Sequence, residues 1–167
     1  MLDSPHFSLR RMAPADLEQV LAIQAQAYPP ALHETADVFA GKLRAFPASN
    51  WVVEGASGLL AYLFAQPARH CLPPPLHDPG APVAAADALH LHDMAVRPEA
   101  RGLGLARHLM RQAQAWGRQQ GLGWMTLVAV GSASDFWQRL GFVPARARKS
   151  LSGYGPAALY MHRPLLG

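Results

Sequence analysis

One short glycine-containing segment constrains the fold of this chain more than any other feature. Residues 96–106 read VRPEARGLGLA and lie between an apolar segment, residues 88–96, and a long amphipathic segment that begins near Leu105. Gly102 and Gly104 allow the backbone to approach a ligand without obstruction by a Cβ atom. The start of a helix offers unpaired N–H groups and a positive dipole end, which suit a phosphate. The segment therefore predicts a strand, a phosphate-binding turn and a helix, in that order.

The residues of this turn exclude two other phosphate-binding motifs. A dinucleotide-binding fingerprint needs a third glycine where this chain has Arg107, and a P-loop needs Gly-Lys followed by Ser or Thr. Arg101 adds a positive charge beside the glycines and favours an anionic ligand. The alternative is an ordinary strand-to-helix turn without a ligand.

A second block, residues 126–142, reads TLVAVGSASDFWQRLGF. It predicts a buried strand, a small polar turn and a short helix that is capped by Ser134 or a nearby residue and runs to Leu140, followed by Gly-Phe. The two blocks are joined by a helix with apolar residues on one face, which ends at Gly121.

Together, the two blocks resemble the GNAT superfamily of N-acetyltransferases. Arg101, Gly104 and Ala106 match the pattern Arg-x-x-Gly-x-Ala of its acyl-CoA pyrophosphate loop. The stretches ALHLHDMAV and DFWQRLGF resemble the arylalkylamine (serotonin) N-acetyltransferases more closely. The resemblance implies an enzyme that transfers an acetyl group from acetyl-CoA directly to a primary amine, most readily a small aryl or alkyl amine. An amino acid, a polyamine, an antibiotic or a protein N-terminus remains possible as the acceptor.

The resemblance assigns the acetyl-CoA site to three stretches of the chain. In GNAT proteins the pantetheine arm pairs with the exposed edge of the strand that precedes the glycine turn. The phosphates then lie at the turn, and the short helix of the second block lies beside the sulfur. The expected acetyl-CoA-binding residues are Met94, Ala95, Val96, Arg101, Gly102, Leu103, Gly104, Leu105, Ala106, Arg107, Phe136 and Trp137.

Two histidines are the candidate catalytic residues. His90 and His92 occupy alternate positions of a predicted strand, so we expect them on one face, with Asp93 on the other. An alkylamine has a pKa of about 10 and must lose a proton before it attacks a thioester. The resemblance assigns this proton removal to His90 and His92. Two alternatives remain: histidines satisfied by local hydrogen bonds, and a zinc site completed by His70 or His77. We expect no metal.

The chain departs from the family at the residue that protonates the leaving thiolate. Many GNAT enzymes have a tyrosine where this chain has Trp137, whose indole N–H donates a hydrogen bond but is not a usable acid. Tyr154, Tyr160 or water could serve instead, or the chain could be a non-catalytic acyl-CoA-binding or sensing module. Cys71 is disfavoured as a nucleophile, because no motif other than His70 accompanies it.

The pattern of the remaining chain predicts an α+β fold. We expect a GNAT-like mixed, mostly antiparallel twisted sheet of about six to seven strands flanked by about four helices. At 167 residues, we expect a single acetyltransferase domain, residues 1–167. The proline-rich residues 66–87 predict a long irregular loop, which is either a wall or lid of the acceptor pocket or a variable surface loop. The other predicted elements are strands at 7–12, 51–53, 59–64, 142–151 and 158–163 and helices at 14–28 and 34–46.

Composition limits the partners and the location that we expect. The net charge of +4 and the pI near 9.7 suit an anionic ligand. The basic residues are scattered apart from Arg146, Arg148 and Lys149, and no nucleic-acid motif accompanies them, so we expect no nucleic-acid partner. The apolar runs are too short to span a bilayer, and the N-terminal residues show no signal-peptide core. With one cysteine, we expect a cytoplasmic protein without a membrane partner, and a homodimer is possible.

Overall fold

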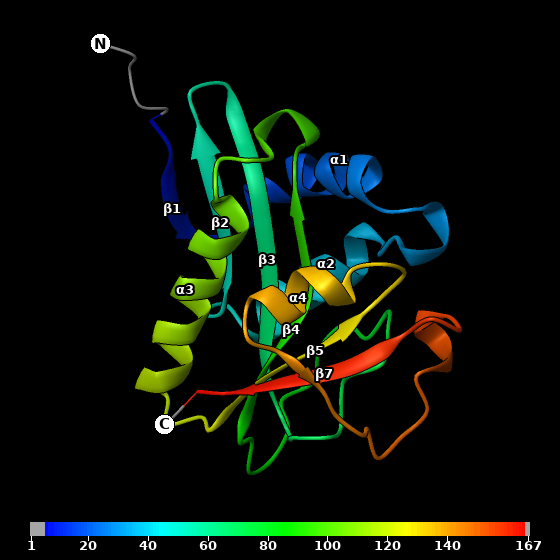
Figure 1. Ribbon diagram of the computed structural model, residues 1–167. Helices are drawn as coiled ribbons and strands as arrows, with labels where there is room; N and C mark the ends of the chain where they lie inside the picture. Colours follow the sequence, from blue (N-terminus) through cyan, green and yellow to red (C-terminus); the bar gives the residue numbers. More distant parts are fainter. Residues whose placement is uncertain (1–5, 166–167) are drawn as a thin grey trace.

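The computed structural model describes residues 6–165. In this part of the chain the strands form a seven-stranded sheet in the order β1-β2-β3-β4-β5-β7-β6. All neighbouring strands are antiparallel except β4 and β5, which are parallel. Helices α1 and α2 cover one face of the sheet, and α3 and α4 cover the other (Figure 1). The predicted α+β class with a mixed, mostly antiparallel sheet is confirmed.

The N-terminal half supplies one side of the sheet and the two helices behind it. Helix α2 starts after Thr35, whose hydroxyl caps it by accepting a hydrogen bond from the Val38 N–H. The elements of this half are β1 (Ser8–Arg11), η1 (Pro14–Asp16), α1 (Leu17–Ala27), η2 (Pro30–Leu32), α2 (Ala36–Ala45), β2 (Asn50–Gly55) and β3 (Gly58–Ala68).

The C-terminal half carries both sequence blocks. Helix α3 buries Leu105, Leu109 and Ala113 against the sheet, as its apolar periodicity predicts. The elements are β4 (Ala88–Val96), η3 (Pro98–Ala100), α3 (Leu105–Gln119), β5 (Trp124–Ala129), α4 (Ser134–Arg139), β6 (Val143–Pro144), η4 (Ser152–Tyr154) and β7 (Leu159–Pro164). Within residues 6–165, none of these helices combines the length and apolar character needed to cross a membrane.

Each face of the sheet has its own hydrophobic core. Trp51 and Val53 of β2 pack on the α3 side, whereas Val52 packs on the side of α1 and α2. This division follows from the alternation of side chains along a strand. On the second side, Phe39 of α2 stacks on Phe64 of β3 with ring centroids 4.4 Å apart. The two cores hold the sheet rigidly between its helices and fix the positions of the strand ends.

Three boundaries differ from the sequence prediction. The proline-rich segment is not wholly irregular, because β3 continues through Pro67, which pairs with Leu89 of β4. Strand β2 begins at Asn50, opposite Phe64, so β3 beyond Phe64 lies at an edge, where a proline is tolerated. Strand β6 is limited to Val143–Pro144, and the chain then leaves the sheet. Helix α4 has Ala133 as its N-cap residue, without a side-chain cap.

An irregularity in the ladder between β3 and β4 changes the geometry around the histidines. Asp93 pairs with Phe64 and Leu91 pairs with Ala65, which leaves His92 without an opposite residue. Such a β-bulge breaks the strict alternation of side chains between the two faces. His92 and Asp93 therefore border the same cavity. The prediction that Asp93 faces the other side of the strand is wrong for this reason.

Strands β4 and β5 pair over only part of their length. Their ladder joins Ala88 to Trp124 and ends at Leu91 and Leu127, although β4 continues to Val96. On its other edge, β5 pairs with β7 along its whole length. The two parallel strands therefore separate, and the last residues of β4 present an unpaired edge beside α3 and α4 (Figure 1).

Candidate active site

A groove with about 1290 Å³ of open space, solvent included, lies where β4 and β5 separate. The end of β4, the glycine turn, the first residues of α3 and the exposed side of α4 line it. All of the expected acetyl-CoA-binding residues border this groove except Leu103, whose side chain is exposed to solvent. Residues far apart in the two sequence blocks thus meet in a single surface feature. Their contact with acetyl-CoA stays a prediction.

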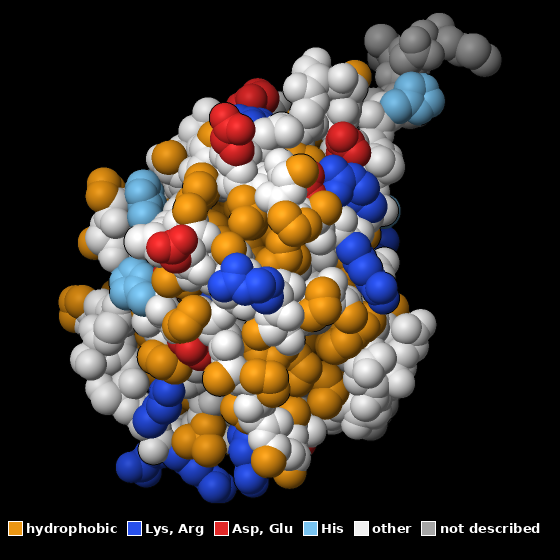
Figure 2. Space-filling view, turned by 180° about the vertical axis from the view of Figure 1, so that it is seen from behind, with side chains coloured by type: hydrophobic (Ala, Val, Ile, Leu, Met, Phe, Trp, Pro, Cys, Tyr) orange, Lys and Arg blue, Asp and Glu red, His pale blue; other side chains and the backbone are white. Residues whose placement is uncertain are grey.

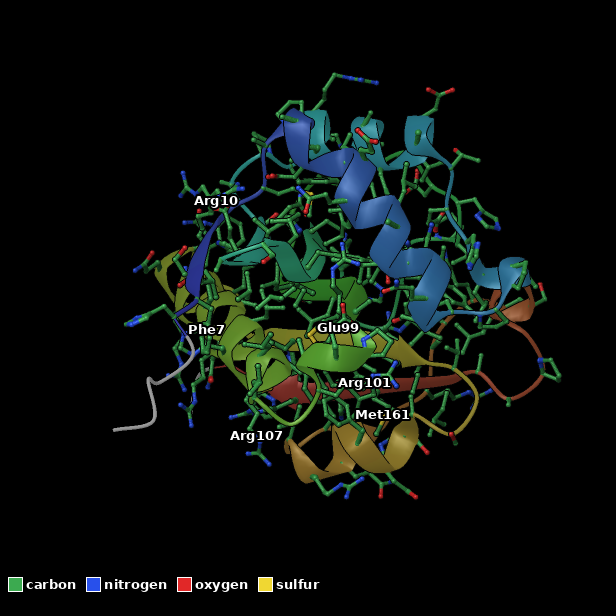
Figure 3. All side chains as sticks on the ribbon, turned by 90° about the horizontal axis from the view of Figure 1, so that it is seen from above. Phe7, Arg10, Glu99, Arg101, Arg107 and Met161 are labelled. Carbon is green, nitrogen blue, oxygen red and sulfur yellow. The ribbon has the colours of Figure 1, made fainter. Side chains whose placement is uncertain are left out.

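The glycine turn has the backbone that only glycine adopts easily. Gly102 has φ +86° and Gly104 has φ +75°, both in the left-handed region. A Cβ atom built on either residue would meet nothing within 4 Å, so these positions face open space. Gly104 is the N-cap residue of α3 and provides no capping side chain. Arg101 and Arg107 also line the groove and lie on the side of the molecule where the turn leads into α3 (Figure 3). The arrangement can bind an anion at the helix N-terminus.

The exposed edge of β4 offers backbone groups to the same groove. Arg97 N–H donates to Leu60 C=O at 2.8 Å, which sets the phase of the antiparallel ladder with β3. By alternation, the N–H and C=O groups of Ala95 face β3, and those of Met94 and Val96 face away from it. Accordingly, the Met94 carbonyl accepts a hydrogen bond from the Tyr28 hydroxyl at 2.6 Å. An extended ligand with amide groups can pair with this edge.

A second cavity with about 390 Å³ of open space adjoins the groove. Tyr28 borders both. Leu76 of the proline-rich segment and Tyr154 of η4 form part of its wall, and the Tyr154 hydroxyl donates to the Pro74 carbonyl at 2.7 Å. The cavity is lined by Tyr28, Leu32, Glu34, Leu76, His92, Asp93, Val128, Val130 and Tyr154.

Glu34 is a buried carboxylate held from several sides. Its backbone N–H and C=O bond to the side-chain amide of Gln24, at 2.7 and 3.0 Å. Its carboxylate meets His92 Nε2 at 3.0 Å and His77 Nδ1 at 2.8 Å, and it accepts the His77 backbone N–H at 3.0 Å. Burial alone would raise the pKa of Glu34, but these hydrogen bonds outweigh it and lower the pKa to about 2. Glu34 is therefore ionised at neutral pH.

His92 is held in one tautomer. Burial lowers its pKa, although the bond with Glu34 opposes this, so the imidazole is neutral at neutral pH. Nε2 faces a carboxylate and must carry the proton, which leaves Nδ1 as the nitrogen with a free lone pair. In the described part of the chain, Nδ1 has no hydrogen-bond partner although it is buried. His92 therefore has an unengaged, buried basic nitrogen, and the residue borders the second cavity.

His90 lies close to His92 but in a different environment. It is buried, and its Nδ1 lies 2.9 Å from the Thr126 hydroxyl of β5. The two imidazole rings are 6.2 Å apart between centroids. Burial lowers the pKa of His90 well below its usual value, so it too is neutral. The structure brings the two predicted catalytic histidines together, but only His92 borders the cavity.

Further charged groups surround this pair, and the sequence reasoning missed them. Burial raises the pKa of Asp93 to about 7, although the Tyr62 hydroxyl donates to its Oδ2 at 3.0 Å. Lys42 is buried near the two histidines, and its Nζ lies 3.2 Å from Gln66 Oε1. Burial lowers the pKa of Lys42. A signal for Lys42 was present, because it follows Val38 by one helical turn and so falls on the apolar face of its predicted helix.

The other candidate groups are placed apart from this site. His70 Nε2 lies 2.7 Å from His162 Nδ1, and both rings stack on Trp124. The Tyr160 hydroxyl accepts the Cys71 backbone N–H at 2.8 Å. The basic C-terminal cluster borders another groove with Cys71, and basic side chains gather at the lower edge of the molecule in Figure 2. Among residues 6–165, no three His, Cys, Asp or Glu side chains are grouped to hold a metal, and the expectation of metal independence stays a prediction.

Comparison with known proteins gives one match in sequence and several in structure. The family model described as the acetyltransferase (GNAT) family matches residues 17–142. No curated protein matches the chain. The ribosomal-protein-S18-alanine N-acetyltransferase of Escherichia coli has 18% identity and a TM-score of 0.70, with 97% of this chain and 96% of that chain covered.

Two further solved structures share the fold. The loading GNATL domain of CurA from Lyngbya majuscula has 12% identity and a TM-score of 0.78, covering 96% of this chain and 98% of that chain. The GNAT family N-acetyltransferase YhbS of Escherichia coli, solved in complex with CoA, has 16% identity and a TM-score of 0.66, covering 99% and 85%. At these identities the likenesses establish the fold alone.

Proposed function

Because the chain belongs to the acetyltransferase (GNAT) family, we propose that it transfers an acetyl group from acetyl-CoA directly to a small primary amine. Dependence on acetyl-CoA follows from the family, whereas the acceptor and the direct transfer are our proposal. The pattern His-x-His in β4, shared with the arylalkylamine N-acetyltransferases that the sequence resembles, supports an aryl or alkyl amine as the acceptor.

Acetyl-CoA would occupy the groove at the end of β4. Its phosphates would lie against Gly102, Gly104 and the start of α3, with Arg101 supplying positive charge. Its pantetheine arm would pair with the Met94 N–H and with the backbone groups of Val96, which face away from β3. The Met94 N–H then faces the acetyl oxygen and stabilises the negative charge that develops there during transfer.

One observation carries the proposal for the acceptor side: His92, which borders the second cavity, has a basic nitrogen, Nδ1, without a hydrogen-bond partner in the described part of the chain. His92 Nδ1 takes the proton of the bound ammonium group, which frees the nitrogen lone pair for attack on the thioester carbon. The ionised Glu34 at Nε2 stabilises the imidazolium that forms and keeps the ring oriented. His90, beside it and bonded to Thr126, belongs to the same proposed base as a supporting member.

The lining of the second cavity narrows the class of acceptor. It contains Glu34 and Asp93 but, among the described residues, no lysine or arginine. Leu32, Val128 and the other apolar side chains form the rest of the wall together with two tyrosines. A cationic amine with an apolar body fits this lining, whereas an acceptor that also carries a carboxylate would bring a further negative charge beside the ionised Glu34 and the partly ionised Asp93.

A matched pair of acceptors tests this proposal. 2-Phenylethylamine and phenylalanine differ by one carboxylate, and we expect kcat/KM to be about 100-fold or more higher for the amine. The reason is that a buried like-charge contact costs several kcal/mol, and each 1.4 kcal/mol corresponds to about tenfold in rate. The measurement is acetyl-CoA-dependent thiol release at varied acceptor concentration. Equal or faster turnover of phenylalanine would contradict the assigned acceptor class.

A second candidate function is a non-catalytic acyl-CoA-binding module. Trp137 of α4, at the position where many relatives have an acidic tyrosine, favours it. The two functions differ in product formation, because a sensing module binds acetyl-CoA without releasing the thiol.

A further inference from the structure

The groove at the end of β4 is called here the acetyl-CoA groove, and the second cavity is called the acceptor cavity. Among the described residues, Tyr28 is the one that borders both. Its hydroxyl lies 2.6 Å from the Met94 carbonyl, on the edge of β4 that faces the groove. We propose that the Tyr28 hydroxyl is the general acid that protonates the sulfur of the leaving CoA. This proposal rests on the proposed function, since it needs acetyl transfer to take place between the two cavities.

The local sequence fixes this tyrosine in place. Tyr28 is the C-cap residue of α1, and Pro29 and Pro30 prevent the helix from continuing past it. The Tyr28 carbonyl also bonds to His33 Nε2 at 2.6 Å, which ties the segment before Glu34 back to the end of α1. The phenol is therefore held from its backbone and from its hydroxyl, on the same short segment that supplies the carboxylate partner of His92.

The other candidate side chains are less well placed. Trp137 lines the groove but has no acidic proton, and its ring packs edge-on against Phe142. Tyr154 borders the acceptor cavity but, unlike Tyr28, does not border the groove. The Tyr160 hydroxyl accepts a hydrogen bond from the Cys71 N–H and borders neither cavity.

The chemistry requires a phenol that stays protonated until the sulfur leaves. Burial raises the pKa of Tyr28, so its hydroxyl carries a proton at any working pH near neutrality. As the amine nitrogen forms the C–N bond, the C–S bond breaks and its electron pair goes to sulfur. The phenol proton moves to the sulfur, and the second proton lost by the nitrogen restores the phenol. His92 releases the first proton to solvent, so the products are the amide, free CoA thiol and one proton.

The test compares Tyr28→Phe with Tyr160→Phe, each of which removes one hydrogen-bonded hydroxyl. We expect Tyr28→Phe to lower kcat about 100-fold, at the low end of general acid contributions, because a thiol of pKa about 8.5 already leaves fairly well. Binding of CoA, measured by calorimetry, should change little in either variant, and Tyr160→Phe should keep wild-type kcat. A solvent deuterium isotope effect on kcat should be present in the wild type and smaller in Tyr28→Phe, in which only the amine protons still transfer.

The outcomes separate this proposal from the proposed function. Wild-type protein that forms no N-acetylated product contradicts the function itself. If the wild type is active and Tyr28→Phe keeps its kcat, the assignment of Tyr28 alone is overturned. A loss of kcat that is accompanied by loss of CoA affinity, or that leaves the isotope effect unchanged, assigns Tyr28 a structural role and also overturns the proposal.

Discussion

Replacement of His92 by glutamine is expected to lower kcat/KM at pH 7 by about 100-fold or more, within the usual contribution of a general base. Glutamine can still donate an N–H to Glu34, as His92 Nε2 does, so the buried carboxylate keeps a partner. It has no basic lone pair to replace Nδ1, the nitrogen that lacks a partner in the described structure. Binding of acetyl-CoA should be unchanged, because His92 does not border the groove.

The pH dependence distinguishes loss of a base from general damage. Because burial lowers the pKa of His92, wild-type activity should hold through neutrality and fall only as the pH drops through that lowered value. The His92→Gln variant should gain activity as the pH rises toward about 10, the pKa of a free alkylamine, since solvent then supplies the deprotonated acceptor. The profile of kcat/KM against pH for both proteins provides the measurement.

His90→Gln is the matched comparison for this prediction. His90 is equally buried, but its Nδ1 is engaged with Thr126 and it does not border the acceptor cavity. We expect a smaller loss than in His92→Gln if His92 alone takes the proton, and an equal loss if the two histidines act as one base. A His92→Gln protein with wild-type turnover at pH 7 would refute the proposed base.

The Gly104→Val variant is expected to bind acetyl-CoA about 100-fold more weakly. Gly104 is the N-cap residue of α3, and its missing Cβ faces open space in the groove. One charge-assisted hydrogen bond to phosphate is worth roughly 1.5 to 3 kcal/mol, and a branched side chain there would keep phosphate from such an N–H group. Loss of about 2.7 kcal/mol corresponds to about 100-fold in affinity. Calorimetric titration with CoA measures the change.

Gly121→Val at the other end of α3 provides the control. Gly121 has φ +74°, almost the value of Gly104, and a Cβ there would also meet nothing within 4 Å. Both variants therefore carry a similar backbone strain, of order 1–2 kcal/mol, and should lose similar thermal stability. Only Gly104→Val should lose CoA affinity. Unchanged affinity in a folded Gly104→Val protein would exclude the glycine turn as the phosphate site.

The sequence predicted most of the elements that carry local signals. The glycine turn, β4 and α3 each have a pattern that depends on a short stretch of chain, and all three lie where the sequence places them. The displacement of Asp93 could not be predicted, because the bulge at His92 depends on the register between two strands. Extension of β3 through Pro67 likewise depends on where the neighbouring strand β2 begins.

The acceptor cavity was the least predictable part of the site. Glu34 and Tyr28 reach His92 and Met94 from a segment far away in the chain, and neither belongs to a recognisable motif. The contacts that matter, a carboxylate that sets an imidazole tautomer and a phenol on a strand carbonyl, exist only after the fold is formed. Leu76 of the proline-rich segment borders the acceptor cavity, so a role of this segment as a wall of the acceptor pocket stays a prediction that the geometry allows.

The most direct measurement of the central claim is the stoichiometry of acetyl-CoA turnover by the wild-type protein across a panel of primary amines. The account predicts that thiol release depends on the amine, that each thiol released is matched by one N-acetylated amine, and that no acetylated protein accumulates without an acceptor. Binding of acetyl-CoA in the groove, without amine-dependent thiol release for any member of the panel, would contradict it and would favour the acyl-CoA-sensing module instead.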